Sequence, residues 1–431
     1  MLKVVFLIFI ILSTQAYANF GEFISGGPGT MAIGNQANPY SANPESHFYH
    51  PAIATRFTRP TISLSASSTE FEFEPIKNIV IQNDTNSQSG EESGEVPNDY
   101  ERISMGQLHA IVPLSYKDHN FFVGASIFTP LLYIAKFDSG SPDLPEYVMY
   151  RSRIRRLDGL VSAGTKINGI SYSLGSRFGF KLEADLEANA SLNGTSFGSS
   201  ARAKANILPK VGLVGSINYS KNSHEFSATI LQGIEMTAEA TVTGQTTDPR
   251  IIFDLASSSL AFFEPHQIRL GYSWESPQKF ASVFINTSYQ LWDGFEPPTL
   301  KLTQEASVLS SNNYENLKTK NTINSSIGLM LTVGSYKILT GLSLYQSPID
   351  SDFSGAGNTI DTDSTSYHLG LSKTFGQLSL NAAAQLKKLK KIDVVKTTGQ
   401  ENGDAGSKLG APGFTIGGEV ININLGISYQ F

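Results

Sequence analysis

The chain has 431 residues, of which 40% are apolar and 16% charged, with a formal net charge of −6 and no cysteine. The absence of cysteine excludes a disulfide framework and a thiolate metal site. The negative balance gives no reason to expect nucleic acid as a partner, and no phosphate-binding loop or other motif indicates a cofactor.

The N-terminus has the pattern of an export signal. Lys3 precedes an unbroken apolar run of nine residues, Val4 to Leu12, and Ala16-Tyr17-Ala18 fits a small-x-small cleavage site. The run is too short to cross a bilayer as a helix, and no later segment reaches 18 consecutive apolar residues. We therefore expect residues 1–18 to be a secretory signal peptide and the mature chain to begin at Asn19.

Residues 19–58 do not alternate as strands do. They are rich in Gly, Pro, Asn and Ser, yet they also carry apolar side chains such as Phe20, Phe23 and Ile24. Glycine permits tight turns, and backbone enclosed in a barrel lumen must satisfy its polar groups internally or with water. The composition favours a compact plug inside a barrel, called the hatch below. A flexible periplasmic extension is the alternative interpretation.

Apolar and polar residues alternate through residues 59–431. Because successive side chains of a strand point to opposite faces, this period indicates strands with one apolar face. Nothing comparable repeats at helical spacing, so the chain is predicted to be all-β. Examples of apolar residues of one parity are Leu108, Ala110, Val112, Leu114 and Tyr116, and later Leu378, Leu380, Ala382, Ala384 and Leu386.

The connections distinguish a membrane barrel from a soluble β-protein. Six are short, and they alternate with seven longer ones, which predicts fourteen antiparallel strands. Short periplasmic turns and longer extracellular loops are typical of bacterial outer-membrane barrels. The short connections are 117–120, 168–169, 221–224, 276–279, 334–335 and 375–376, and the long polar stretches include 76–100, 244–262, 293–320, 347–363 and 392–412.

The last strand supports the same location. Residues 421–431 alternate strictly and end on the aromatic Phe431, as bacterial barrel proteins typically do. This ending resembles their assembly signal, so we expect the barrel assembly machinery, outer-membrane lipid and lipopolysaccharide as partners of a monomeric, multi-pass barrel in a Gram-negative outer membrane. The 26 Phe and 17 Tyr suffice for interfacial girdles.

Two N-terminal segments resemble the hatch of the FadL family of long-chain fatty acid transporters and aromatic-hydrocarbon channels. They are Gly29 to Ala37 and the tripeptide His50-Pro51-Ala52. The likeness continues in 264–292 and in 341–348, so it spans the mature chain. It implies passive transport of long-chain fatty acids or other hydrophobic compounds through a plugged barrel with a lateral exit. A general or polar-solute porin, or a structural barrel, is the alternative.

The resemblance also implies gating residues. In the family the tripeptide ends the hatch against a kink in the third strand, which opens a side passage. His50 stands where the family has Asn, and its ring is bulkier and can titrate near neutrality. The third strand, expected over 121–133, contains Gly124 and Pro130, either of which could interrupt a ladder or mark an ordinary strand end. The gating candidates are therefore His50, Pro51, Ala52, Gly124 and Pro130.

Three arginines are ligand candidates. Arg151, Arg153 and Arg155 share one strand face, and a lipid-facing arginine at mid-depth costs about 2–4 kcal/mol. We therefore expect them in the upper lumen or at its rim, where they either attract a carboxylate or pair with acids such as Glu183 and Asp185. The family analogy adds the hatch residues Phe20, Phe23 and Ile24.

The remaining polar residues do not indicate an enzyme. None of the seven histidines lies in a recognisable nucleophile motif, so no catalytic residues are predicted. A lysine run at the outer end of the penultimate strand either meets lipopolysaccharide phosphates or is a solvated strand end. It comprises Lys387, Lys388, Lys390 and Lys391.

Overall fold

The fold is a closed β-barrel. The computed structural model describes residues 24–82, 91–96, 100–117, 119–131, 146–147, 149–150, 156–179, 182–190, 199–207, 211–245, 252–292, 295, 301–302, 318–349, 359–395 and 413–431. Among these residues fourteen strands form the barrel, and each strand pairs antiparallel with its neighbours, which confirms the predicted fold class. The barrel strands are β1 (Thr61–Phe73), β4 (Ile103–Tyr116), β5 (His119–Pro130), β7 (Asp158–Ile167), β8 (Ile170–Gly179), β11 (Val211–Lys221), β12 (His224–Leu231), β15 (His266–Glu275), β16 (Ala281–Leu291), β18 (Thr322–Val333), β19 (Tyr336–Tyr345), β21 (Ser364–Phe375), β22 (Leu378–Val395) and β23 (Gly413–Gln430).

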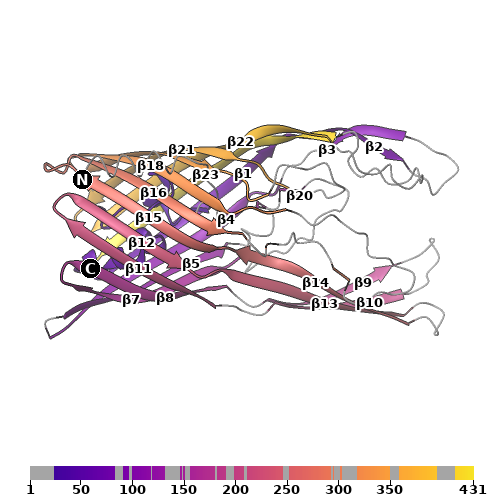
Figure 1. Ribbon diagram of the computed structural model, residues 1–431, viewed down its shortest axis with the longest axis horizontal. Coiled ribbons are helices and arrows are strands. Elements are labelled where there is room, and N and C mark those ends of the chain that lie inside the picture. Colours follow the sequence, from indigo (N-terminus) through magenta and orange to yellow (C-terminus); the bar gives the residue numbers. More distant parts are fainter. Residues whose placement is uncertain are drawn as a thin grey trace.

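The six short turns gather at one end of the barrel, called the short-turn end, and the long connections lie at the other, the loop end (Figure 1). The turns fall where the sequence predicts them, to within a residue or two. In the β7–β8 turn Asn168 and Gly169 both have positive φ, 50° and 84°, as the Asn-Gly hairpin turn requires. The backbone N–H of Phe431 donates to the carbonyl of Pro60, where the last strand meets the first.

The outer surface of the barrel is apolar. Outward side chains such as Leu174, Leu213, Ile230 and Leu369 are more than half exposed, and so broad an apolar surface needs lipid rather than water around it. A ring of aromatic residues borders it at the short-turn end, as a membrane interface requires. The ring comprises Tyr116, Phe121, Tyr172, Tyr219, Phe226, Phe280, Tyr336, Phe375, Tyr429 and Phe431.

The helices in the described ranges, α3 (Pro28–Met31), η1 (Pro44–Phe48) and η2 (Pro51–Arg56), have at most six residues each. No helix in the described ranges is long and apolar enough to cross a membrane.

Further strands extend the loop end. Five of them form an antiparallel sheet that projects beyond the barrel (Figure 1), in the order β17 (Lys301–Leu302), β14 (Ile252–Glu264), β13 (Ile234–Gln245), β10 (Ser199–Ile207) and β9 (Leu182–Ala190). The long polar stretch predicted at 244–262 contains most of β14. This strand is held by backbone hydrogen bonds to β13, and such pairing does not require that apolar and polar residues alternate strictly. Two smaller pairs join β2 (Ile76–Gln82) to β3 (Glu91–Val96), and β6 (Glu146–Tyr147) to β20 (Thr359–Ile360).

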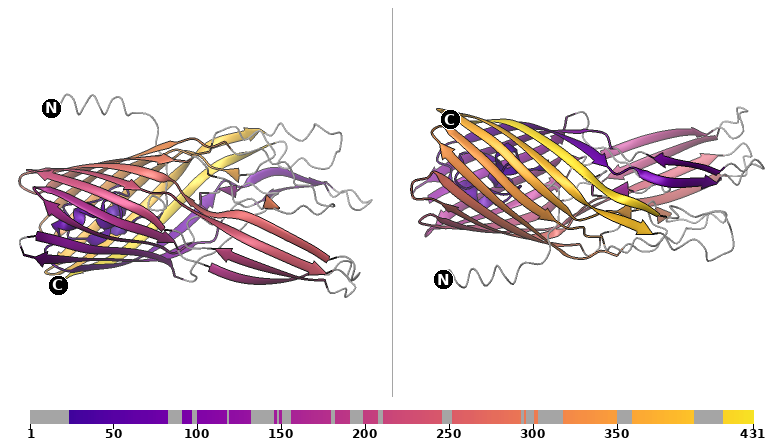
Figure 2. Two further views of the ribbon diagram at one scale, coloured as in Figure 1. Left: turned by 60° about the horizontal axis from the view of Figure 1, so that its bottom comes forward. Right: turned by 90° about the horizontal axis from the view of Figure 1, so that it is seen from above.

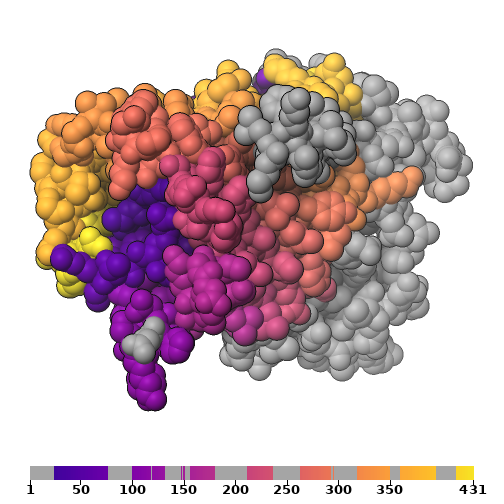
Figure 3. Space-filling model, turned by 60° about the vertical axis from the view of Figure 1, so that its left-hand side comes forward, coloured from indigo at the N-terminus to yellow at the C-terminus, as the bar shows by residue number. Residues whose placement is uncertain are grey.

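Residues 24–58 lie within the barrel, against inward side chains of strands from all round the wall (Figure 2). They form α3 (Pro28–Met31) and two 3₁₀ helices, η1 (Pro44–Phe48) and η2 (Pro51–Arg56). Figure 3, with the short-turn end turned forward, shows indigo N-terminal atoms between strands of other colours. The predicted signal peptide, residues 1–18, lies outside the described residues.

Candidate functional site

The barrel wall has a notch that receives the hatch. Gly328 of β18, Gly341 of β19 and Gly370 of β21 face the hatch segment Ala32–Gly34. A Cβ at Gly328 or Gly341 would lie 2.5 Å from backbone atoms of that segment, and one at Gly370 would lie 2.3 Å from the Cβ of its alanine. Only glycine permits so close an approach of two backbones. Wall and hatch are therefore complementary in shape here.

A buried carboxylate organises the hatch itself. Glu45 is fully buried and accepts hydrogen bonds from the backbone N–H groups of Gly29 (2.8 Å) and Thr30 (3.2 Å) at the start of α3. Its other oxygen accepts from the Asn43 side chain at 2.7 Å. Burial raises the pKa of Glu45 to about 7, although these hydrogen bonds oppose the rise.

His47 joins the hatch to the third barrel strand. Its Nδ1 lies 2.9 Å from the Ser126 hydroxyl of β5, and its Nε2 lies 2.8 Å from the Ser162 hydroxyl of β7. The ring occupies the space that a side chain at Gly124 would need, since a Cβ there would lie 2.5 Å from Nε2. Because Gly124 has no side chain, the ring of His47 can pack directly against the inner face of the wall.

The third strand is regular at the two proposed gating positions. Gly124 pairs with Ile111 of β4 and with Ser162 of β7, and neither ladder shifts register along β5. Pro130 is the last residue of the strand, where a missing N–H donor costs least. In this conformation the wall is continuous at Gly124, and Pro130 is an ordinary strand end.

The tripeptide His50-Pro51-Ala52 contacts a wider part of the wall. His50 Nδ1 lies 2.8 Å from the Thr229 hydroxyl of β12, and Nε2 lies 3.4 Å from the Asn286 side-chain oxygen of β16. The two residues that follow it begin η2 and are buried, and η2 also contacts β5. The histidine itself is directed away from the third strand.

The two hatch histidines and Glu45 make hatch seating dependent on pH. Burial lowers the pKa of His47, and that of His50, from the ordinary 6.5 to about 3. A displaced, solvated hatch would regain the ordinary values, so the histidines favour seating above about pH 6.5 and lose that contribution as the pH falls. Glu45, raised from 4.5 to about 7, favours seating most below 4.5 and loses its contribution as the pH rises to 7. Because the two histidines outweigh the single carboxyl between pH 4.5 and 6.5, seating should be tightest near pH 6.5.

An aromatic cluster lies in the lumen on the loop side of the hatch. The Phe73 and Tyr147 rings stack with centroids 4.1 Å apart, Tyr150 packs edge-on against both, and Phe71 packs in a tilted arrangement against Phe73. The Tyr147 hydroxyl bonds to the backbone of β23, which ties a loop across the lumen. The same buried apolar cluster includes hatch residues, namely Ile24, Phe48, Tyr49 and Ile53.

Lys387 is a buried cation in this aromatic region. Its Nζ lies 4.1 Å from the ring centroid of Tyr345 and 5.8 Å from that of Tyr150. The side chain is 1% exposed and points into the lumen. The Tyr345 hydroxyl in turn accepts a hydrogen bond from hatch Asn35 at 3.3 Å. One tyrosine therefore connects the cation to the hatch.

The other lysines of that run differ from Lys387. Lys388 is exposed and pairs with Glu419 at 3.0 Å, and Lys391 is exposed and pairs with Glu74. The four lysines were predicted as one run, and the burial of Lys387 was not predicted. Alternation along β22 was the available signal, since Lys387 shares the inward parity of Asn381 and Gln385.

A buried ion network lies at the loop end of the lumen. Arg177 donates two hydrogen bonds to Asp158 (2.8 and 2.7 Å), and Arg156 contacts Glu264 at 2.8 Å and Asp158 at 3.3 Å. These ion pairs join β7, β8 and β14. The predicted arginines 151, 153 and 155, like Phe20 and Phe23, lie outside the described residues.

The short-turn end of the lumen is polar instead. A cavity of about 60 Å³ lies between the hatch and β1, β19, β21, β22 and β23. Serine, threonine, asparagine and glutamine side chains line it together with Lys337. Such a lining is unfavourable for a hydrocarbon chain, because its polar groups would lose their partners. In the described part of the chain, no group of three His, Asp or Glu side chains could hold a metal ion.

Comparisons with known proteins bear on the fold. No protein-family model matches the chain, and a search of curated sequences finds no match. Solved structures do resemble it over almost its whole length. A Pseudomonas aeruginosa FadL homologue gives a TM-score of 0.61 at 14% identity, covering 97% of this chain and 99% of its own. The CymD monoaromatic hydrocarbon channel gives 0.54 at 12% identity (96% and 99%), and the P. putida toluene transporter TodX gives 0.51 at 12% (94% and 98%). The chain therefore has the fold of these channels.

Proposed function

We propose that this protein is an outer-membrane channel that passes hydrophobic compounds passively, with long-chain fatty acids as the preferred substrate and the hatch as its valve. One observation carries the proposal: a buried aromatic cluster holding one lysine lies directly against the hatch inside a closed barrel. The short-turn end would face the periplasm. The barrel would act as a monomer, inserted by the barrel assembly machinery.

The upper lumen suits both parts of a fatty acid. The rings of Phe71, Phe73, Tyr147 and Tyr150 offer a hydrocarbon chain an apolar surface. The carboxylate would meet Lys387, whose ammonium now rests on the Tyr345 ring. A buried charge-assisted contact to a carboxylate is stronger than a cation–π contact, so the anion would draw the ammonium from the ring.

The same contact would couple the ligand to the valve. Tyr345 also accepts a hydrogen bond from Asn35, which adjoins the hatch segment seated in the glycine notch. Displacing Lys387 frees Tyr345 to move and weakens that hydrogen bond, worth about 0.5–1.5 kcal/mol. Ligand binding would thus shift the hatch toward release.

A lateral exit agrees with the two ends of the lumen. The polar short-turn end disfavours passage of a hydrocarbon into the periplasm. Withdrawal of His47 would uncover the inner face of β5 at Gly124, and a lateral exit there would also require the β5 ladders to open. A photoactivatable palmitate should then label the outward residues Val123 and Ala125 of β5. Labelling that is no stronger there than at Leu270 of β15, which is also outward, would exclude this route.

The main test compares uptake through two lysine variants. Cells that carry the chain in their outer membrane should take up oleate saturably and exclude sucrose. In Lys387→Gln the half-saturating oleate concentration should rise about tenfold, equivalent to about 1.4 kcal/mol, whereas toluene uptake should not change. Lys388→Gln, which alters an exposed lysine on the same strand, should match the parent.

Three outcomes would contradict the proposal. Sucrose flux would indicate the alternative polar-solute porin, equal oleate kinetics in Lys387→Gln would remove the carboxylate site, and an absence of oleate and toluene uptake would leave a structural barrel.

The other ligand candidates can be tested in the same assay. Glutamine at Arg151, Arg153 and Arg155 together, or deletion of residues 19–25, should weaken oleate binding if those residues contact the ligand.

A further inference from the structure

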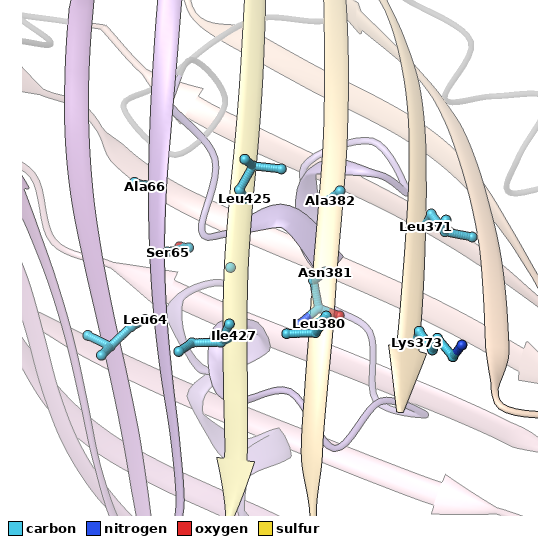
Figure 4. A pocket seen from close by; sticks show the side chains of 11 residues that line it. Leu64, Ser65, Ala66, Leu371, Lys373, Leu380, Asn381, Ala382, Leu425 and Ile427 are labelled. Atoms are coloured by element: carbon cyan, nitrogen blue, oxygen red, sulfur yellow. The ribbon is translucent and has the colours of Figure 1, made fainter. Parts of the chain in front are cut away.

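The lipid-facing wall has a hollow near its short-turn end. Two rows of outward side chains bound it, each running across β1, β23, β22 and β21 (Figure 4). The row nearer the loops is Ala66, Leu425, Ala382 and Leu371, and the row nearer the short turns is Leu64, Ile427, Leu380 and Lys373. Seven of these eight side chains are apolar.

The hollow arises from unequal side-chain lengths. Ala66 and Ala382 flank Leu425 in one row, and each leaves only a methyl group where neighbouring positions carry leucine. The resulting volume is about 650 Å³. Behind it, Gly426 faces the hatch, and its missing side chain leaves room for Pro28. The inner side of the wall at Gly426 is thus packed against the hatch.

Lys373 makes one end of the hollow positive. It has the outward parity of Leu369, Leu371 and Phe375, and it lies two residues from the short turn after β21. Its Nζ rests 4.4 Å from the ring centroid of Tyr336 and 4.7 Å from that of Phe375, both in the aromatic ring at the short-turn end. Over the described ranges of the chain its contacts are with these rings rather than with a carboxylate.

This position matches the headgroup level of the membrane leaflet at the short-turn end. A lysine is tolerated on the lipid face near the interface, where its cost falls to about 0–1 kcal/mol, and there it attracts anionic headgroups. The apolar hollow lies on the hydrocarbon side of Lys373. A cation at one end of an apolar hollow has the chemistry that recognises an anionic amphiphile.

We propose that the hollow binds one acyl chain of an anionic phospholipid of the periplasmic leaflet, with the lipid phosphate at Lys373. This site is separate from the ligand path in the lumen. Its assignment to the periplasmic leaflet rests on the proposed function only for the membrane orientation of the barrel. The lipid would remain through extraction while neighbouring lipids exchange. It would also cover the wall over Gly426, directly outside the hatch.

Native mass spectrometry of the full-length protein tests the proposal. The protein is equilibrated in detergent micelles with equal amounts of phosphatidylglycerol and zwitterionic phosphatidylethanolamine, and the lipid retained on the barrel is counted. One phosphatidylglycerol should be retained about five-fold in preference, as one lysine at a lipid surface provides. Lys373→Gln should abolish the preference, and Ala382→Leu, which fills the hollow, should abolish retention of either lipid.

Matched variants separate the site from general lipid contact. Lys221→Gln removes another outward lysine at the short-turn end of β11, and Ala228→Leu enlarges an outward alanine of β12. Both should retain phosphatidylglycerol as the parent does. The proposal is overturned if Lys373→Gln keeps the preference, if Ala382→Leu keeps the lipid, if the controls lose it equally, or if oleate displaces phosphatidylglycerol at equal concentration. None of these results depends on transport activity.

Discussion

Alanine at position 341 should loosen the hatch, because its methyl group would occupy space that the hatch backbone fills. The Cβ would lie 2.5 Å from the backbone N of Gly34 and from the backbone of Ile33. Carbon contacts are favourable at about 3.5–4.0 Å, so the hatch backbone would have to recede by roughly 1 Å. Overpacking of this kind costs about 1–3 kcal/mol. The population with a displaced hatch should therefore rise about 5- to 150-fold.

The displaced population can be measured with a single cysteine. The chain has none of its own, and Ala37 is a buried hatch residue close to cysteine in size. With Ala37→Cys as background, Gly341→Ala should speed reaction with a membrane-impermeant maleimide by the same factor, because labelling follows the open population. Ion conductance across a planar bilayer should rise in parallel.

Gly215→Ala is the matched control for this substitution. Gly215 lies on β11, and a Cβ there would have nothing within 4 Å, so its labelling rate should equal that of the background. If Gly341→Ala and Gly215→Ala label and conduct alike, the notch does not hold the hatch and the reasoning fails.

Three further predictions concern a disulfide between the hatch and the wall, the pH dependence of hatch seating, and the buried ion network. The hydroxyl oxygens of Thr55 in the hatch and Ser171 in β8 lie 2.6 Å apart. A disulfide between Thr55→Cys and Ser171→Cys should therefore block oleate uptake until it is reduced. Uptake by fully cross-linked protein would show that this part of the hatch need not move. Relative to labelling of an exposed cysteine at the same pH, labelling of the hatch cysteine should fall as the pH rises to about 6.5 and change little above 7, with Glu45→Gln steepening this fall and His47→Gln reducing it; a relative rate independent of pH would contradict both assignments. Asp158→Asn leaves two buried guanidinium groups with one fewer carboxylate, so the free energy of unfolding should fall by about 3–5 kcal/mol, and an unchanged heat-induced gel-mobility transition would refute this.

Local chemistry was enough to predict the wall of the barrel. Alternation of apolar and polar residues identified the barrel strands, and turn residues such as Asn168-Gly169 identified their short connections. These signals are local because strand period and turn conformation depend on neighbouring residues alone. The five-stranded sheet at the loop end was missed, because its strands have no lipid belt to impose strict alternation.

The interior depended on tertiary structure. Lys387 meets Tyr345, and Tyr345 meets Asn35, only because barrel closure and register bring three distant parts of the chain to one place. Alternation could assign Lys387 to the inward face, but not to an aromatic partner. His47 likewise lies against Gly124 because of the path that the hatch backbone takes. The composition of the hatch does not determine that path. The sequence by itself thus determined the barrel and which residues face lipid, whereas the tertiary structure decided which inward residues meet, because contacts across a lumen depend on register and closure.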